Sequence, residues 1–479
     1  MRRRALPFLT LLVAGCTVGP DYHRPELSVP SEFRGRAPDA PAGAQSLGDV
    51  AWWQIFQDET LQSLIRTTLA ENYDVRIAAA RVLQARAQVT YTRSFQAPDL
   101  SGSAAAPYQR IIGDQDRAPF QFKETFSPLA SFDLFWEIDF WGRLRRATEA
   151  SRGDLLATES AQRFVTTTLV SDVATAYFQL RELDLELEIS KRTLASRENA
   201  LRLVKIRQQG DVAGMMDVRQ AEVLLFTAAA TVPDVERRIE QTENLISVLL
   251  GRNPDAVPRG RPLLQQLALP AVPAGLPSSL LERRPDVVQA EGQLAAATAR
   301  IGVAKADYFP RVLLTGAVGA GGIRIDSTWF GPQGVLAVAP QATIPIFNWG
   351  RTGAGVDTAR GAAEEALARY QQTVQGAFRD VSDSLVEHRK RGETRVQQEA
   401  LVESLRDAAR LAGVRYRGGV SSYLEVLDTE RQLFDSELQL AQAQRDELLA
   451  VVRLYRALGG GWEASPEQRP AASTGARAY

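Results

Sequence analysis

The chain has 479 residues and nearly balanced charge, with 56 basic and 57 acidic side chains. This balance leaves no basic excess for a nucleic-acid partner, and one cysteine with two histidines cannot assemble a zinc or copper cluster. The sequence has no nucleophile elbow, phosphate-binding glycine loop or dinucleotide fingerprint, so it indicates neither an enzyme nor a cofactor-binding protein.

Residues 1–15 predict a secretory signal peptide that ends at the single cysteine. Three arginines precede an apolar run, and the box Leu12–Cys16 is typical of lipoproteins, in which Cys16 becomes the acylated N-terminus. Thr17 follows the cysteine, where an aspartate would favour retention in the inner membrane. Residues 16–57 are therefore expected to form a lipidated N-terminal extension. An ordinary cleaved signal with an incidental cysteine is the alternative.

Two related halves organise the rest of the chain. Trp141-Gly142-Arg143 recurs 208 positions later as Trp349-Gly350-Arg351, and Pro98 recurs 212 positions later as Pro310. A repeat of this length indicates a duplicated domain rather than a solenoid. The halves are expected at 58–252 and 276–462, with a proline-rich linker at 253–275 and a flexible tail at 463–479.

Each half is expected to contain a helix, two strands and a long helical hairpin. Ala- and Arg-rich residues predict a helix at 74–95. Strands follow at about 100–140, divided into 100–112 and 122–140, because Ser131–Trp141 alternates apolar and mainly polar side chains. Such alternation suits a strand between lipid and water or a half-buried strand of a soluble sandwich. The second-half strands are expected at about 312–347, as 312–325 and 335–347. Pro340 and Pro345 there predict a bulge or a strand that runs past the lipid zone.

The helical hairpins are expected at about 143–251 and 351–458. Apolar residues between 143 and 208 follow the 3–4 spacing of a coiled coil, interrupted at Ser190 and Arg197. Glycines predict the turns at Gly210–Gly214 and Gly418–Ser422. A coiled-coil pair that acts only as a spacer is the alternative.

Six motifs together resemble the TolC-like outer-membrane efflux factors, and more closely the OprM/NodT-type lipoprotein channels. They occur in the order of that family and extend over nearly the whole mature chain: Cys16–Tyr22, Trp52-Trp53, Trp136–Arg143, Leu276–Asp286, Tyr416–Leu424 and Ala457–Trp462.

The resemblance implies a mixed α and β homotrimer in the outer membrane, lipid-anchored and with a large periplasmic part. Each chain would give four strands to a twelve-stranded outer-membrane β-barrel, and the long helices would continue it as an α-helical coiled-coil barrel. The strands themselves support an oligomer, because four strands leave two open edges that neighbouring chains must close.

The resemblance also implies a passive, gated exit duct for drugs or other small molecules in a tripartite efflux system. Its partners would be a periplasmic membrane-fusion adaptor and a proton-driven inner-membrane pump. The implied pore gate consists of Leu424, Glu425, Asp428 and Arg431. The implied adaptor-docking tips are Val212, Ala213, Gly214, Val420, Ser421 and Ser422.

Several other interpretations remain open. Asp428 and Arg431 could be a solvated surface pair, and the tips could reflect turn chemistry alone. The duct could instead serve a protein-secretion or metal-export system. A lipid-anchored coiled-coil scaffold of the envelope, without a pore, is the non-transport alternative.

Overall fold

The computed structural model describes residues 17–35, 46–110, 124–266 and 277–460. The chain forms two compact units and passes through each of them three times. The first unit comprises Met1–Glu26, Arg81–Glu159 and Gln289–Gln371, and the second comprises the intervening segments and the C-terminal part.

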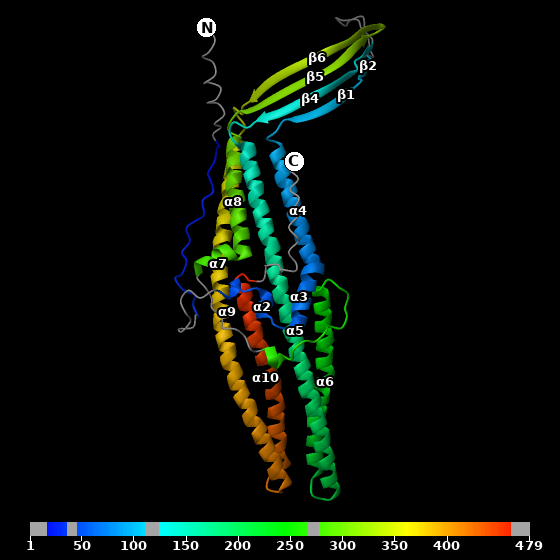
Figure 1. Ribbon diagram of the computed structural model, residues 1–479, viewed down its shortest axis with the longest axis vertical. Coiled ribbons are helices and arrows are strands. Elements are labelled where there is room, and N and C mark those ends of the chain that lie inside the picture. Colours follow the sequence, from blue (N-terminus) through cyan, green and yellow to red (C-terminus); the bar gives the residue numbers. More distant parts are fainter. Residues whose placement is uncertain (1–16, 36–45, 111–123, 267–276, 461–479) are drawn as a thin grey trace. The chain divides into compact units, whose positions relative to one another are not determined.

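One antiparallel sheet lies in the first unit. Its strands are β1 (Asp99–Ala105), β2 (Tyr108–Arg110), β3 (Glu124–Phe126), β4 (Leu129–Ile138), β5 (Arg311–Ile325) and β6 (Thr328–Thr343). β4 pairs with β1 on one side and with β5 on the other, and β5 also pairs with β6. The short β2 and β3 pair with each other, and β3 pairs with the end of β5. Within the described residues β1 and β6 are therefore the outer edges of the four-stranded part (Figure 1).

Prolines divide the first-half strands more finely than expected. The predicted strand 100–112 is divided around Pro107, between β1 and β2, and the predicted strand 122–140 is divided around Pro128, between β3 and β4. Proline has no N–H to donate to a ladder, so the pairing stops there. Residues 111, 112, 122 and 123 lie outside the described residues.

The bulge predicted at Pro340 and Pro345 is wrong. Pro340 lies within β6 opposite Leu314, and the register shift of this strand pair is at Gly321/Ile323. Within the described chain β6 pairs only with β5, and that ladder continues through Pro340 without a change of register. Pro345 follows the end of the strand, which begins at Thr328 rather than near 335.

One face of the sheet is polar near Asp133. Ser103 on β1 lies opposite Ser131 on β4, with 2.9 Å between the hydroxyl oxygens. Ser103 also donates to Asp133 at 2.7 Å. Ser131 and Asp133 are two positions apart and share this face, as the alternation predicts.

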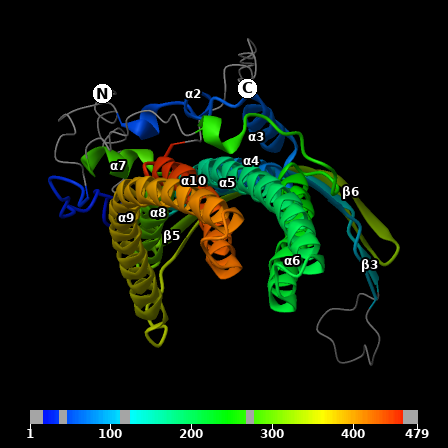
Figure 2. The ribbon, with the colours of Figure 1, turned by 90° about the horizontal axis from the view of Figure 1, so that it is seen from below.

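The helices are α2 (Trp52–Ile55), α3 (Glu59–Glu71), α4 (Tyr73–Ser94), α5 (Arg143–Gln209), α6 (Met215–Leu249), α7 (Pro277–Arg283), α8 (Pro285–Ala306), α9 (Arg351–Arg417) and α10 (Tyr423–Ala457), with 3-10 turns η1 (Leu47–Asp49) and η3 (Leu263–Gln266). α5 and α9 have 67 residues each, and α6 and α10 have 35 each. Figures 1 and 2 show α6 beside α5 and α10 beside α9. None of the described helices combines the length and apolar composition that crossing a membrane requires.

Glycines allow the backbones of α5 and α8 to approach closely in the first unit. A Cβ atom at Gly153 would lie 2.9 Å from the backbone nitrogen of Ala296 and from the carbonyl oxygen of Gly292. Real Cβ atoms do not approach so closely, so even alanine at Gly153 would push the two helices apart.

The segment after residue 16 lies against the same unit. The Val18 N–H donates to the carbonyl of Trp141 at 3.0 Å, and the buried Arg146 donates to Asp21 at 2.6 Å. Cys16 itself lies outside the described residues.

Asp58, which follows the Trp52-Trp53 motif, is hydrogen-bonded to three segments of the second unit. Its carboxylate caps α3 by accepting from the Thr60 N–H at 2.9 Å. Its other oxygen accepts from the Tyr177 hydroxyl at 2.7 Å and from the Arg261 N–H at 2.9 Å. Burial raises the pKa of Tyr177, so this phenol remains a donor. Asp58 therefore joins α3, α5 and the segment before η3.

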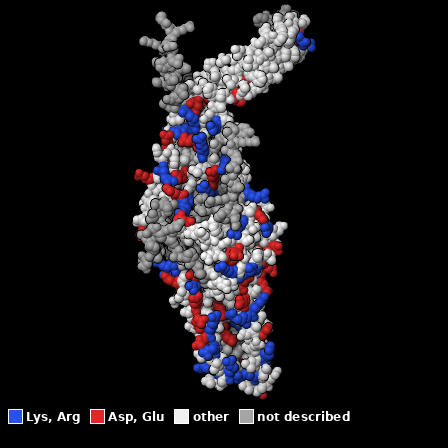
Figure 3. All heavy atoms as spheres, in the orientation of Figure 1, with Lys and Arg blue, Asp and Glu red and all other residues white. Residues whose placement is uncertain are grey.

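Charged side chains are distributed unevenly over the surface. On the face shown in Figure 3, acidic and basic side chains are mixed over the helices and are sparse on the strands. β6 has no charged residue along its whole length, although Leu336 and Val338 on it are exposed.

Candidate functional site

The two hairpin tips have the same turn geometry. At the first, Asp211 adopts a φ of +56°, and the Val212 N–H donates to the Arg207 carbonyl at 2.9 Å. At the second, Gly419 adopts a φ of +73°, and the Val420 N–H donates to the Arg415 carbonyl at 3.0 Å. This 6→1 bond is that of a Schellman turn, whose left-handed position favours glycine. Turn chemistry thus accounts for Gly419, whereas Asp211 occupies the same left-handed position at the first tip.

Both tips expose apolar side chains. Val212 is 67% exposed and Val420 is 73% exposed. Gly214 and Ser422 are also exposed, whereas Ala213 and Ser421 are half-buried. Each tip therefore exposes a valine, which suits contact with another protein, and the first tip also carries the exposed Asp211.

The four predicted gate residues lie at the start of α10. Leu424 is 61% exposed, and Asp428 and Arg431 are exposed on the same side of the helix. Arg431 donates to Asp428 at 2.9 Å, and this neighbour raises the pKa of Arg431. Glu425 lies 3.3 Å from Arg415 of α9. The structure thus brings Leu424, Asp428 and Arg431 onto one exposed face, and it pairs both acids within the chain.

The opposite face of α10 belongs to a core that joins the two hairpins. Apolar residues of α5, α6, α9 and α10 form this cluster: Leu201, Val204, Val218, Ala221, Leu224, Ala412, Tyr416, Tyr423, Val426 and Leu427. The rings of Tyr416 and Tyr423 are 5.1 Å apart, and the Arg207 guanidinium lies 4.5 Å from the Tyr416 ring centre. The cluster near the tips therefore holds the second hairpin to the first within one chain.

Arg197 is buried beside this core and was not singled out as functional from the sequence. It is 2% exposed, donates to the Leu224 carbonyl at 2.6 Å, and lies 4.8 Å from the ring centre of Phe434. Burial raises the pKa of nearby Glu430, and the charge of Arg197 opposes that shift. The sequence did contain a sign of this residue, because Arg197 interrupts the apolar stripe of α5.

Two buried carboxylates form a second polar site between α5, α6 and α10. Glu186 accepts from Arg238 of α6 at 2.8 Å and from Gln442 of α10 at 3.0 Å. Glu182, one helical turn earlier, lies 3.3 Å from Arg445 of α10. Burial and the adjacent Glu186 raise the pKa of Glu182. Only the folded chain brings these residues together, so sequence spacing could not identify them.

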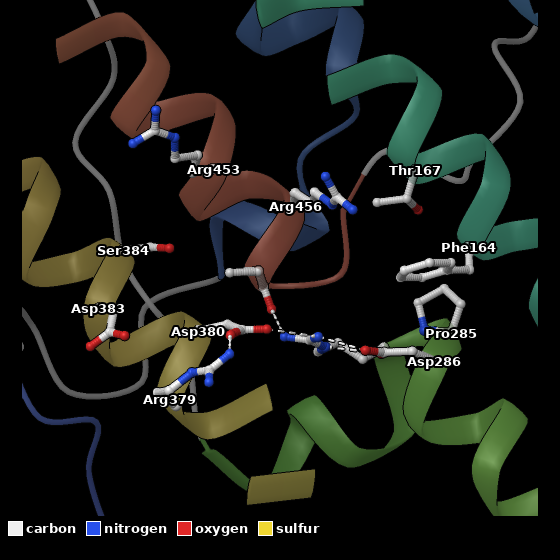
Figure 4. A pocket seen from close by; sticks show the side chains of 12 residues that line it. Phe164, Thr167, Pro285, Asp286, Arg379, Asp380, Asp383, Ser384, Arg453 and Arg456 are labelled. Carbon is white, nitrogen blue, oxygen red and sulfur yellow. Dashed lines mark hydrogen bonds and ion pairs between the residues drawn. The ribbon is translucent and has the colours of Figure 1, made fainter. Parts of the chain in front are cut away.

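Arg284, from the motif Leu276–Asp286, lies beside a hollow of about 560 Å³ in the second unit (Figure 4). Arg284 donates to Asp286 at 2.6 Å, to Asp380 of α9 at 3.2 Å and to the Ala457 carbonyl of α10 at 3.3 Å. These bonds use the guanidinium to join three segments, which gives this motif a structural role. In the described residues, acidic, histidine and cysteine side chains form no group of three that could hold a metal ion.

The comparisons with known proteins decide the family. The family model described as outer membrane efflux protein matches residues 64–252 and 276–460. The chain belongs to the outer membrane efflux protein family.

Relatives of known name agree with this assignment. The chain is 35% identical over 475 residues to the solvent efflux pump outer membrane protein SrpC of Pseudomonas putida, covering 97% of this chain and all of the relative. It is 33% identical to the cation efflux system protein CusC of Escherichia coli O6:H1 (strain CFT073), covering 96% of this chain and 99% of that one. Among solved structures, the outer-membrane channel OprN superposes with a TM-score of 0.85 at 32% identity, covering 93% of this chain and all of OprN.

The predicted family, efflux function and outer-membrane location are thereby confirmed. This outer membrane efflux protein is a transport component with a mixed α and β fold like that of OprN. The predicted roles of the gate and tip residues stay predictions, because their geometry alone does not test them.

Proposed function

We propose that this efflux protein is the passive outer duct of a tripartite system that exports drugs or other small organic molecules. A periplasmic membrane-fusion adaptor would dock on it, and a proton-driven inner-membrane pump would supply the energy. The observation that carries the proposal is the family match over both halves of the chain. The solvent efflux pump relative supports small organic molecules as the substrate class. No bond is made or broken in this function, so the protein is not an enzyme.

The proposed assembly is a homotrimer whose twelve strands close into a barrel in outer-membrane lipid. β1 and β6 each have one paired side within the described chain, and open edges in lipid leave backbone groups without hydrogen bonds. The absence of charge in β6, together with its exposed Leu336 and Val338, supports contact with lipid.

The proposed organisation is two equivalent halves, at 58–252 and 276–462, with the linker 253–275 between them. Matched helix lengths support it. So do the left-handed glycines before the long helices, Gly142 at φ +78° and Gly350 at φ +79°. Residues 463–479 of the expected tail lie outside the described residues.

The proposed gate is the exposed face of α10 with Leu424, Glu425, Asp428 and Arg431, three copies of which would surround the pore axis. The exposed positions of Leu424, Asp428 and Arg431 support this role. Adaptor docking at the tips is supported by the exposed Val212 and Val420.

The proposed lipid anchor is Cys16, after removal of residues 1–15. Val18 and Asp21, which closely follow it, are hydrogen-bonded to Trp141 and Arg146. An acyl chain on Cys16 would therefore be attached next to the end of β4, which would itself lie in the membrane of the proposed trimer.

Export of metal ions is the second candidate, because the CusC relative is named as part of a cation efflux system. An outer channel for protein secretion shares the architecture, but the relatives described above are named for efflux of solvents and of cations. A scaffold without a pore is not favoured by a family of efflux channels.

The proposal is tested by expressing this chain with the adaptor and pump of a solvent efflux system in a Gram-negative strain that lacks its own outer channels. We expect raised resistance to organic solvents and drugs and no change in tolerance of toxic metal cations. Metal tolerance without drug resistance would establish the cation alternative. A change in neither, with the protein present in the outer membrane, would refute both.

A further inference from the structure

We propose that Trp349 interlocks neighbouring copies of this chain, its indole filling the hollow at the start of β1 in the next copy. The proposal rests on the trimer proposed above, and it assigns to that trimer a specific contact at the ends of the paired strands.

The first half of the chain contains the corresponding contact within one molecule. Trp141 follows β4, and its indole N–H donates to the Pro310 carbonyl at 2.8 Å. Its ring stacks on Phe309 with 4.7 Å between centroids and an interplanar angle of 25°. Phe309 and Pro310 lie immediately before β5, the strand that pairs with β4. Trp141 thus fastens the end of one strand to the start of its neighbour.

The registers of the two halves show which residues correspond. Asp99 of β1 pairs with Phe135 of β4, and Arg311 of β5 pairs with Thr343 of β6. Arg311 is 212 positions after Asp99, and Thr343 is 208 positions after Phe135, the same offsets that relate the sequence motifs. Trp349 therefore corresponds to Trp141, and Pro98 corresponds to Pro310.

Among the described residues of its own chain, Trp349 has no such partner. It is 90% exposed, and its ring contacts Phe347, which is also exposed, at a centroid distance of 5.3 Å. The backbone of Trp349 has a φ of +54°, a region that non-glycine residues seldom adopt. A large aromatic pair held in this way at a sheet edge is expected to be covered in the assembled protein.

The other edge of the sheet carries a matching hollow of about 880 Å³. It lies beside the start of β1 and is lined by Tyr91, Phe95, Pro98, Phe135 and Leu144, among others. Tyr91, Phe95 and Phe135 are all exposed. The charged pair at its wall, Glu137 and Arg143, is joined by two hydrogen bonds of 2.7 and 2.9 Å. The hollow is therefore lined by three aromatic rings together with aliphatic and polar side chains, and it is large enough for an indole.

Pairing β6 of one copy with β1 of the next brings the two surfaces together. Phe135 of β4 pairs with Thr315 of β5 within the chain. By the offsets of 208 and 212, Thr343 corresponds to Phe135 and Ser103 corresponds to Thr315. The same register between copies therefore places Thr343 opposite Ser103. The strands then continue toward Trp349 and Pro98. The indole N–H would donate to the Pro98 carbonyl of the next copy, as Trp141 donates to Pro310. A lipid or detergent molecule in the hollow would have no indole N–H to donate to the Pro98 carbonyl.

The contact is tested with the photo-crosslinking amino acid p-benzoylphenylalanine. It is placed at position 349 of the full chain in the outer membrane. Two differently tagged copies are co-expressed and irradiated, and the product is mapped by mass spectrometry. We expect an intermolecular crosslink to residues 91–99. The same amino acid at position 141 is the matched control, and its crosslink should be intramolecular, to residues 309–310.

Stability of the trimer gives a second readout. We expect Trp349→Ala to lower the temperature at which trimers dissociate in detergent, and Trp349→Phe, which lacks the N–H donor, to be intermediate. Trp329→Ala removes the same side chain at the other end of β6 and should leave that temperature unchanged.

The outcomes distinguish failure of the Trp349 contact from failure of the proposed trimer. A chain that is monomeric by native mass spectrometry in detergent refutes the trimer. Trimers that crosslink at position 349 only to lipid, or to residues outside 91–99, refute the interlock alone. Equal dissociation temperatures for the wild-type protein, Trp349→Ala and Trp329→Ala would also refute it.

Discussion

Glu182→Gln isolates the cost of burying two adjacent carboxylates between α5, α6 and α10. Glu186 receives hydrogen bonds from Arg238 and Gln442. Glu182 has its Oε2 atom 3.3 Å from Arg445, whereas its buried Oε1 atom has no donor. Arg445 is itself shared with Asp446 at 2.7 Å. Glutamine has the same shape as glutamate without the charge, and its amide can donate a hydrogen bond to Glu186.

The sign of the effect follows from the raised pKa. Burial and the charge of Glu186 raise the pKa of Glu182 from 4.5 to about 8. Between these values the folded state holds a proton that the unfolded state has released. The free energy of unfolding therefore falls as pH rises through this window, by up to about 1.4 kcal/mol per pH unit. Glutamine does not titrate, so Glu182→Gln removes this loss.

Thermal dissociation and unfolding in detergent, followed by tryptophan fluorescence at pH 5 and at pH 8, measure the effect. We expect Glu182→Gln and the wild-type protein to melt at similar temperatures at pH 5. At pH 8 the variant should melt several degrees higher, because about 1 kcal/mol shifts the midpoint by roughly 2–4 °C in domains of about 150–250 residues.

Glu186→Gln is the matched control on the same helix face. It removes the partner of Arg238, so we expect it to lower the melting temperature at pH 8. The reasoning is refuted if Glu182→Gln gains nothing at pH 8 relative to pH 5, or if both variants are destabilised equally at the two pH values.

Three further predictions concern the gate, the buried arginine and the anchor. Asp428→Ala, and more so Asp428→Ala with Arg431→Ala, should raise conductance and lower cation preference in planar bilayers; an unchanged double variant would make the pair an ordinary surface ion pair. Arg197→Ala should destabilise the hairpin core by about 1.5–3 kcal/mol, because the Leu224 carbonyl loses a charged hydrogen-bond donor, and an unchanged melting temperature would contradict this. The mature chain should begin at a triacylated Cys16 by intact mass spectrometry, and Cys16→Ser should still insert; an unmodified N-terminus elsewhere would exclude the anchor.

Local patterns predicted the helices well. α5, α6, α9 and α10 begin and end within two residues of the expected positions, because proline-free runs with 3–4 spacing end at glycine-containing turns. The strands were less accurate, since pairing depends on partners elsewhere in the sheet. Pro340 illustrates this point: the sequence does not show that β6 pairs with β5 through this proline without a change of register.

The candidate sites also differ in how far the sequence could identify them. Gate and tip residues were named through resemblance to a family, and spacing contributed only the shared helix face. Arg197 was visible as an interruption of an apolar stripe, although the stripe could not show that the side chain is buried against Phe434. Glu182 and Arg445 are separated by more than 260 positions, so their proximity exists only after folding.

The equal lengths of the returning helices limit how this chain can change during evolution. α6 and α10 each contain 35 residues, which is five heptads. Deleting one residue from α6 would rotate everything beyond it by about 100° and turn its core face toward water. Deleting seven keeps the faces aligned, but it shortens the helix by about 10 Å. Seven residues must then also leave α5, and seven each from α9 and α10, if the two tips are to end level. We expect related chains to differ in hairpin length by whole heptads, with four such changes made together.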